Sequence, residues 1–205
     1  ADKWLHKGLK IISDELPNQV LDDGGNFERS PMYHAIFLED LLDLLNLAKT
    51  FPKVIPDVNV TYWNEVAHNM LYWLNVMRHP DGEIAFFNDA AIGIAPSSEE
   101  LNAYATRLGL RADTINRRIT HLADSGYIRL SFRNVLALLD VAPIGPDYLP
   151  GHAHADTLSF ELSLFRQRVF VNCGTSKYGT DAIRQLERST AFHNTVVVDS
   201  KNSSE

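Results

Sequence analysis

GHAHADTLSFELSL, residues 151–164, is the stretch that decides the fold of this chain. After Asp156 apolar and polar residues alternate strictly, and a period of two is typical of a strand with one buried face. The same parity places His152, His154 and Asp156 on one face, where the strand is expected to begin. Two imidazoles and a carboxylate can bind a metal or transfer a proton, or they can be ordinary polar residues at a strand entrance. The rest of the chain has to decide between these interpretations.

The composition indicates a chain that folds around a core. It has 205 residues, of which 45% are hydrophobic, enough for one large domain or two small ones. The net charge of -7 argues against a nucleic-acid-binding protein. The single cysteine, Cys173, excludes an internal disulfide. No apolar run approaches the ~20 residues needed to span a bilayer, so no membrane insertion is expected.

The first half of the chain has the period of helices. Apolar residues recur at helical spacing, Pro17 marks a helix end, and Ser30 is an expected N-cap with Pro31 at the first helical position. Thr61 is a plausible cap of a later helix. We predict amphipathic helices, with Trp and Tyr facing inward, over residues 4–17, 31–49, 61–77 and 98–108. Joined by loops, they suggest stacked helical hairpins.

The period changes to two from about residue 124. Gly, Pro, Asn and Asp separate short alternating segments, which predict strands over residues 127–132, 135–141, 158–165, 168–173 and 195–199. Helices followed by antiparallel strands indicate an α+β chain or two domains. We divide the chain into a helical part, residues 1–112, and a strand part, residues 113–205.

Three motifs together resemble a known family. They are DGGNFERSPMYH at residues 23–34, GHAHAD at 151–156 and RSTAFHNT at 188–195. In order and spacing they resemble the heparinase II/III-like polysaccharide lyases. The resemblance implies the end of an (α/α) toroid of helical hairpins followed by the start of an antiparallel β-sandwich, with the active site between them. It also implies an internal piece of a longer lyase, whose further catalytic Asn or His would precede Ala1.

The resemblance further implies β-elimination on a uronic-acid-containing polysaccharide. Such lyases remove the proton α to the sugar carboxylate and expel the 4-linked oxygen. Tyr33 is similar to the family's catalytic tyrosine, an acid and for one stereochemistry also the base. Because a free tyrosine has a pKa near 10, nearby cations such as Arg29 are expected to lower the pKa of Tyr33. His152 is similar to the catalytic or charge-neutralising histidine. On spacing alone, Tyr33 can equally be a buried aromatic residue.

The same resemblance implies a zinc site with a mainly structural role. His154 and His193 match two of its ligands, and the third, an Asp in many members, aligns with Asn172. An amide oxygen is a weaker zinc ligand than a carboxylate, so an occupied and an empty site both remain open. Cys173 follows Asn172 and is expected to point to the opposite face, which leaves Asp156 as the replacement ligand. No organic cofactor is implied.

The partner implied by the family is an acidic polysaccharide. The predicted substrate-binding residues are Asn26, Arg29, Tyr178, Arg184 and Arg188. Guanidinium groups pair well with carboxylate or sulfate, although the last two arginines can equally lie on a solvated helical face. Polymers of this kind lie outside the cell's cytoplasm, so a periplasmic or extracellular location is expected.

A second interpretation is a non-catalytic glycan-binding or structural homologue that keeps the fold. The change at Asn172 and the missing upstream residue favour it. A metallohydrolase is disfavoured, because its ligands would normally include a carboxylate at the Asn172 position or an additional histidine.

Overall fold

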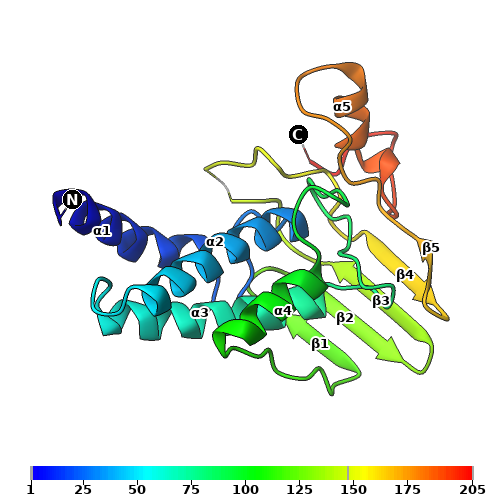
Figure 1. Cartoon of the computed structure of the whole chain (residues 1–205). Helices are drawn as coiled ribbons and strands as arrows, with labels where there is room; N and C mark the ends of the chain where they lie inside the picture. The colour runs from blue at the N-terminus through cyan, green and yellow to red at the C-terminus, as the bar shows by residue number, and fades with distance from the viewer. Residues whose placement is uncertain (1, 147, 205) are drawn as a thin grey trace.

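The computed structural model describes residues 2–146 and 148–204, and it has a helical part followed by a five-stranded antiparallel sheet (Figure 1). The α+β class predicted from the change of period is therefore confirmed. The helices are α1 (Asp2–Gln19), α2 (Pro31–Thr50), α3 (Asp57–Val76), α4 (Ser98–Leu108) and the short α5 (Ala182–Glu187). The strands are β1 (Ile119–Leu122), β2 (Tyr127–Phe132), β3 (Val135–Asp140), β4 (Phe160–Leu164) and β5 (Gln167–Phe170). None of the described helices is both long and apolar enough to cross a membrane.

Local capping chemistry sets the helix ends. The Ser30 hydroxyl accepts a hydrogen bond from the Tyr33 N–H at 3.2 Å, with Pro31 at the first position of α2, as the sequence predicts. Two predicted ends are wrong. The helix α3 begins at Asp57 rather than near Thr61, and α1 continues past Pro17 to Gln19. A proline in the last turn removes only one hydrogen bond, so it does not have to end the helix there.

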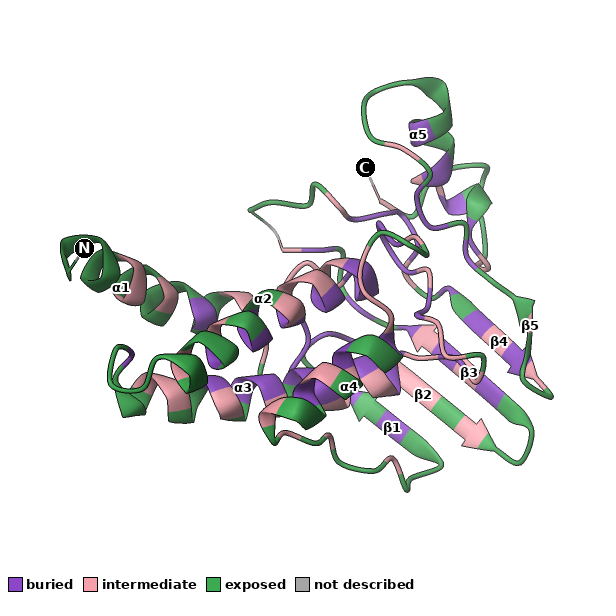
Figure 2. Ribbon diagram, in the orientation of Figure 1, coloured by how far each residue is buried: buried purple, intermediate pink, exposed green. Residues whose placement is uncertain are grey.

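The helical core lies where α2 packs on α3 and α4. Leu38, Leu42, Trp63 and Met70 are completely buried in it. Helix α1 differs, because Leu16 is its only buried residue and Trp4 is 78% exposed, contrary to the expectation that tryptophans face inward. Within the described part of the chain, nothing covers this end of α1 (Figure 2).

The five strands follow one another in sequence order across the sheet. One face packs against the end of α3 through a second core, which is made of Trp73, Val76, Met77, Ala85, Phe87, Leu122, Tyr127, Leu136 and Leu138. In addition, the Trp73 indole N–H donates to the Ser125 hydroxyl at 2.8 Å. Helical and strand parts therefore share apolar and polar contacts at one junction.

The buried face of β4 is the polar one, opposite to the expectation from its alternation. Glu161 and Ser163 are buried, whereas Leu158 is 69% exposed. The Glu161 carboxylate contacts His79 Nε2 at 2.7 Å and accepts the Phe86 and Asn172 N–H groups, and His79 Nδ1 lies 2.7 Å from the Ser163 hydroxyl. Leu158 has a φ of +68°, which breaks the parity between the histidine motif and the strand. The strand is also shorter than predicted.

The opposite face of the sheet is apolar and half open. Exposed residues on it include Leu130, Phe132, Val135 and Phe160 (Figure 2). Among the described residues only partial cover is present: the Arg118 guanidinium lies over the Phe132 ring, and the Phe170 ring packs beside Phe160. One predicted strand is absent, and one observed strand was missed. Residues 195–199 form no strand, because the chain turns at Asp199 and Ser200 with positive φ and makes a single bridge, and β1 was not predicted.

Candidate functional site

Tyr33 and His152 lie together although they come from different parts of the fold. Tyr33 is in the first turn of α2, and His152 ends the proline- and glycine-rich connection after β3. Their ring centroids are 4.2 Å apart. Tyr178, from the loop after β5, places its hydroxyl 2.6 Å from that of Tyr33. Three segments thus bring two phenols and an imidazole to one place.

The loop before α2 positions Tyr33 by close backbone packing. Gly24 has a φ of +88°, and a Cβ on it would lie 2.4 Å from the Asn69 carbonyl oxygen, so only glycine fits. The Asn26 N–H donates to His34 Nδ1 at 3.2 Å, and His34 Nε2 donates to the Met70 carbonyl oxygen. Burial lowers the pKa of His34 to about 3, so the imidazole is neutral and holds the loop.

Asp89, which sequence reasoning missed, is the residue that organises the site. Its carboxylate oxygens lie 2.9 Å from His152 Nδ1 and 2.8 Å from His154 Nε2. The Arg184 guanidinium also binds both oxygens, one of them at 2.7 Å. The available signal was weak: Asn88-Asp89 is a polar pair inside the otherwise apolar residues 84–92.

Asp89 determines which nitrogen of His152 can take up a proton. Burial acts to raise the pKa of Asp89, but hydrogen bonds from His154, Arg184 and His152 outweigh it and lower the pKa to about 2. A carboxylate only accepts hydrogen bonds, so His152 must carry its proton on Nδ1. Nε2 then keeps its lone pair and faces Glu28, whose carboxylate oxygen is 3.9 Å away. This arrangement suits a general base.

The environment of Tyr33 favours a proton donor. Burial, followed by the hydrogen bond with Tyr178, raises the pKa of Tyr33 above its ordinary value. The expectation that nearby cations lower this pKa is therefore wrong. Arg29, which has a φ of +58°, turns its guanidinium to the carbonyl oxygens of Pro143 and Gly145, at 2.5 and 3.1 Å.

Most predicted substrate-binding side chains have partners within the chain. Asn26 donates to the Gln19 carbonyl oxygen and accepts from the Glu28 N–H. Arg184 is buried against Asp89, and Arg188 donates to the Ala153 carbonyl oxygen at 2.9 Å. Tyr178 is 53% exposed, so its hydroxyl remains accessible. Substrate contact by these residues stays a prediction.

A second group of side chains could hold a metal ion. One nitrogen each of His154 and His193 and the sulfur of Cys173 all lie within 4.8 Å of one another. Two nitrogens bound to one tetrahedral zinc at ~2.05 Å lie about 3.3 Å apart. His154 Nδ1 and His193 Nε2 are 3.3 Å apart. The spacing of these two nitrogens therefore fits a shared zinc ion.

Cys173, rather than Asn172, joins the two histidines. The Asn172 amide donates to the Ser159 hydroxyl and accepts the Asn194 N–H, and Asp156 lies outside the group. The expectation that Cys173 points away is wrong, because β5 ends at Phe170 and strand alternation does not reach residue 173. Burial, then the charge of Glu187, raises the pKa of the Cys173 thiol to about 11. A bound metal would displace the thiol proton.

Comparisons of the sequence and of the structure with known proteins both find lyases of the same kind. The chain is 25% identical to a heparin-sulfate lyase of Pedobacter heparinus and 27% identical to one of Bacteroides stercoris, in each case over 98% of this chain and 33% of the relative. The chain thus spans about a third of the length of these curated relatives. Similar solved structures include heparan sulfate lyase HepC from Pedobacter heparinus, with a TM-score of 0.75 at 23% identity, over 98% of this chain and 34% of that one. A structure of Heparinase III has a TM-score of 0.80 at 19% identity, over 98% and 36%.

Two family models match successive parts of the chain. "Heparinase II/III N-terminus" matches residues 1–108, and "Heparinase II/III-like, C-terminal" matches residues 114–205. The first covers more than half of the chain by itself. The chain belongs to the heparinase II/III-like family.

Proposed function

We propose that the protein containing this chain is a polysaccharide lyase that cleaves a uronic-acid-containing polysaccharide by β-elimination. The observation that carries the proposal is the pairing of a protonated phenol with an imidazole at a ring distance of 4.2 Å. The heparan-type specificity of the relatives makes a glycan with uronic acid and sulfate the first candidate substrate. Such polymers lie outside the cytoplasm, so the proposal includes a periplasmic or extracellular location.

The proposed reaction uses His152 and Tyr33 in succession. The Nε2 lone pair of His152 removes the proton α to the sugar carboxylate, and its positive charge is stabilised by Asp89 through Nδ1. The C4–O bond breaks as the C4=C5 double bond forms. The Tyr33 hydroxyl gives its proton to the leaving oxygen. The raised pKa of Tyr33 supports this role, because it keeps the phenol protonated until the leaving oxygen develops charge.

We also propose that the histidine–cysteine group binds zinc in a structural role. Asp89 supports this because it accepts a hydrogen bond from the Nε2–H of His154, which leaves the Nδ1 lone pair free for the metal. His154 Nδ1, His193 Nε2 and Cys173 Sγ would be the ligands. When bound, the ion would join the loop after β5 to the histidine motif, and no step of the elimination passes through it.

The test is direct. Full-length protein is incubated with a panel of uronic polymers, and the ultraviolet absorbance of the new C4=C5 bond is followed. An increase with at least one polymer, lost in His152→Ala, supports the proposal. Binding of polymer without any increase in absorbance would instead favour the non-catalytic glycan-binding homologue.

A further inference from the structure

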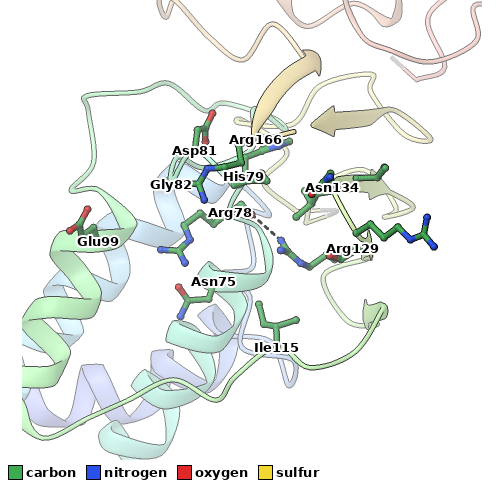
Figure 3. A pocket seen from close by; sticks show the side chains of 15 residues that line it. Asn75, Arg78, His79, Asp81, Gly82, Glu99, Ile115, Arg129, Asn134 and Arg166 are labelled. Carbon is green, nitrogen blue, oxygen red and sulfur yellow. Dashed lines mark hydrogen bonds between the residues drawn. The ribbon is translucent and has the colours of Figure 1, made fainter. Parts of the chain in front are cut away.

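A hollow lies at the other end of the sheet from the Tyr33–His152 site. In the β2–β3 hairpin, Tyr127 pairs with Asp140 at one end, where the Tyr127 hydroxyl bonds the Arg29 carbonyl oxygen. Phe132 pairs with Val135 at the other end, five residues along β2, or roughly 17 Å away. The hollow opens there, between the end of α3, α4 and the hairpin (Figure 3).

The hollow has a volume of about 660 Å³, which lies within the ~300–1,000 Å³ of small-molecule sites. Four arginines line it, and we refer to it as the arginine hollow: they are Arg78, Arg129, Arg133 and Arg166. None of these four forms an ion pair with a carboxylate among residues 2–146 and 148–204. Two acids also line it. Asp81 is bound by Arg168, which leaves Glu99 at the rim.

One of the arginines, Arg129, is held in place and partly removed from water. Arg129 NH1 donates to the carbonyl oxygens of Val76 and Arg78, both at 2.9 Å, so the guanidinium is fixed beside Arg78 (Figure 3). Its Nε is buried without a partner in the described structure. Burial, then the charge of Arg78, lowers the pKa of Arg129 to about 10. Two half-buried like charges repel each other, and an anion between them would relieve this cost.

Both hairpin turns carry an arginine that borders the hollow, although the Arg133 guanidinium lies over the Phe132 ring, 5.1 Å from its centroid. Arg133 lies in the turn between β2 and β3, and Arg166 in the turn between β4 and β5. Each has a positive φ, of +54° and +68°, so both turns are tight. The neighbouring side chain of Asn134 adds a donor suited to hydroxyl groups, whereas the Asn75 amide is paired with that of Asn102.

We infer that the arginine hollow is a second binding site for an acidic saccharide, in which guanidinium groups clamp a sulfate or carboxylate of the sugar. The inference rests on the proposed function for the identity of the ligand, but not on catalysis. Guanidinium groups bind such oxyanions bidentately, and the fixed Arg129 lowers the conformational cost of binding. Through this site the protein holds a polymer chain at a point remote from the cleaved bond.

The experiment measures binding directly. Full-length protein carrying Tyr33→Phe, which is expected not to consume ligand, is titrated calorimetrically with a sulfated uronic oligosaccharide, its desulfated form and sodium sulfate. Two sites per chain are expected for the sulfated oligosaccharide. Adding Arg78→Ala and Arg166→Ala should weaken one site at least about tenfold, because each removes a charge-assisted contact. If the double variant also weakens binding of the desulfated form, the clamp is assigned to the carboxylate. If sodium sulfate is the only probe that binds the hollow, the site is assigned to a free anion.

The control variant is Arg117→Ala, which removes the same charge from an exposed residue outside the hollow. It should leave both sites unchanged. If it weakens binding as much as the double variant does, the effect is general electrostatics and the inference is overturned. Unchanged binding in the double variant overturns it too. A chain that has no lyase activity but loses saccharide binding with Arg78→Ala and Arg166→Ala would contradict the proposed function alone.

Discussion

Asp89 is a fully buried carboxylate that accepts hydrogen bonds from His152, His154 and Arg184. The stability of the site therefore depends strongly on this one residue. A buried ion pair adds little against an apolar pair of the same size, but removing one partner leaves an uncompensated charge. Here the residue left alone would be Arg184, whose side chain is 4% exposed.

Asp89→Asn should lower the free energy of unfolding by about 3–5 kcal/mol near neutral pH. Because the pKa of Asp89 is lowered to about 2, its stabilising effect is complete above the unfolded value near ~3.9 and is lost as pH falls towards 2. The difference between wild type and variant should therefore shrink below about pH 4. Urea unfolding at pH 7 and pH 3, with a chelator present, measures it. Exposed Asp22→Asn is the matched control, and equal effects of the two variants would contradict the role of Asp89.

Tyr33→Phe removes only a hydroxyl whose one hydrogen bond, to Tyr178, is exposed to solvent. In the full-length protein, turnover should fall by about 10²–10⁴, the range for loss of a general acid, while the midpoint of thermal unfolding changes little. Tyr178→Phe removes the other half of the same hydrogen bond, and we expect a smaller loss. Wild-type turnover in Tyr33→Phe would remove the central claim of the mechanism.

At the scale of elements, periodicity predicted most of the secondary structure. Helix α4 and strand β2 have the predicted bounds, because each has a clear period and capping or turn residues at its ends. The face of β4 was not predictable from its own residues. Glu161 is buried because His79, 82 positions earlier, supplies a partner for it, and no local pattern records that contact.

Leu158 joins the histidine motif to β4, and its left-handed backbone conformation lowers the stability of the fold. A non-glycine residue in the left-handed region costs roughly 1–2 kcal/mol, and the exposed Leu158 side chain offsets little of it. Leu158→Gly should therefore stabilise the chain by up to about 1 kcal/mol, after the added freedom of glycine in the unfolded chain is subtracted. Chemical denaturation provides the measurement. Ile94→Gly, at an exposed residue without positive φ, should not stabilise.

The proposed zinc site joins the loop after β5 to the histidine motif, so its loss should be felt by these two elements. Full-length protein purified with zinc should hold about one ion per chain by metal analysis, and Cys173→Ser should reduce that amount sharply. Asn172→Ala is the control, since the Asn172 amide bonds to Ser159 and Asn194 instead. Full zinc retention in Cys173→Ser together with loss in Asn172→Ala would return the third ligand to Asn172.

At the scale of the whole molecule, the site depends on contacts that sequence patterns cannot reveal. The three motifs identified Tyr33, His152 and His154 because their residues cluster along the chain. Asp89 is 63 positions from His152 and 95 from Arg184, and it follows neither a helix nor a strand period. Only the folded backbone, in which the Asp89 N–H donates to the His152 carbonyl oxygen, brings it under the two histidines.

Arg29 has a consequence for how the molecule melts. Its carbonyl oxygen accepts hydrogen bonds from the Tyr127 hydroxyl and the Asn88 amide, and its guanidinium binds carbonyl oxygens of the connection after β3. One residue of the helical part is thus fastened to the sheet through both its backbone and its side chain. Neither part can detach without breaking these bonds and opening the second core. Calorimetry should therefore record a single cooperative transition, and Arg29→Ala should begin to separate it into two.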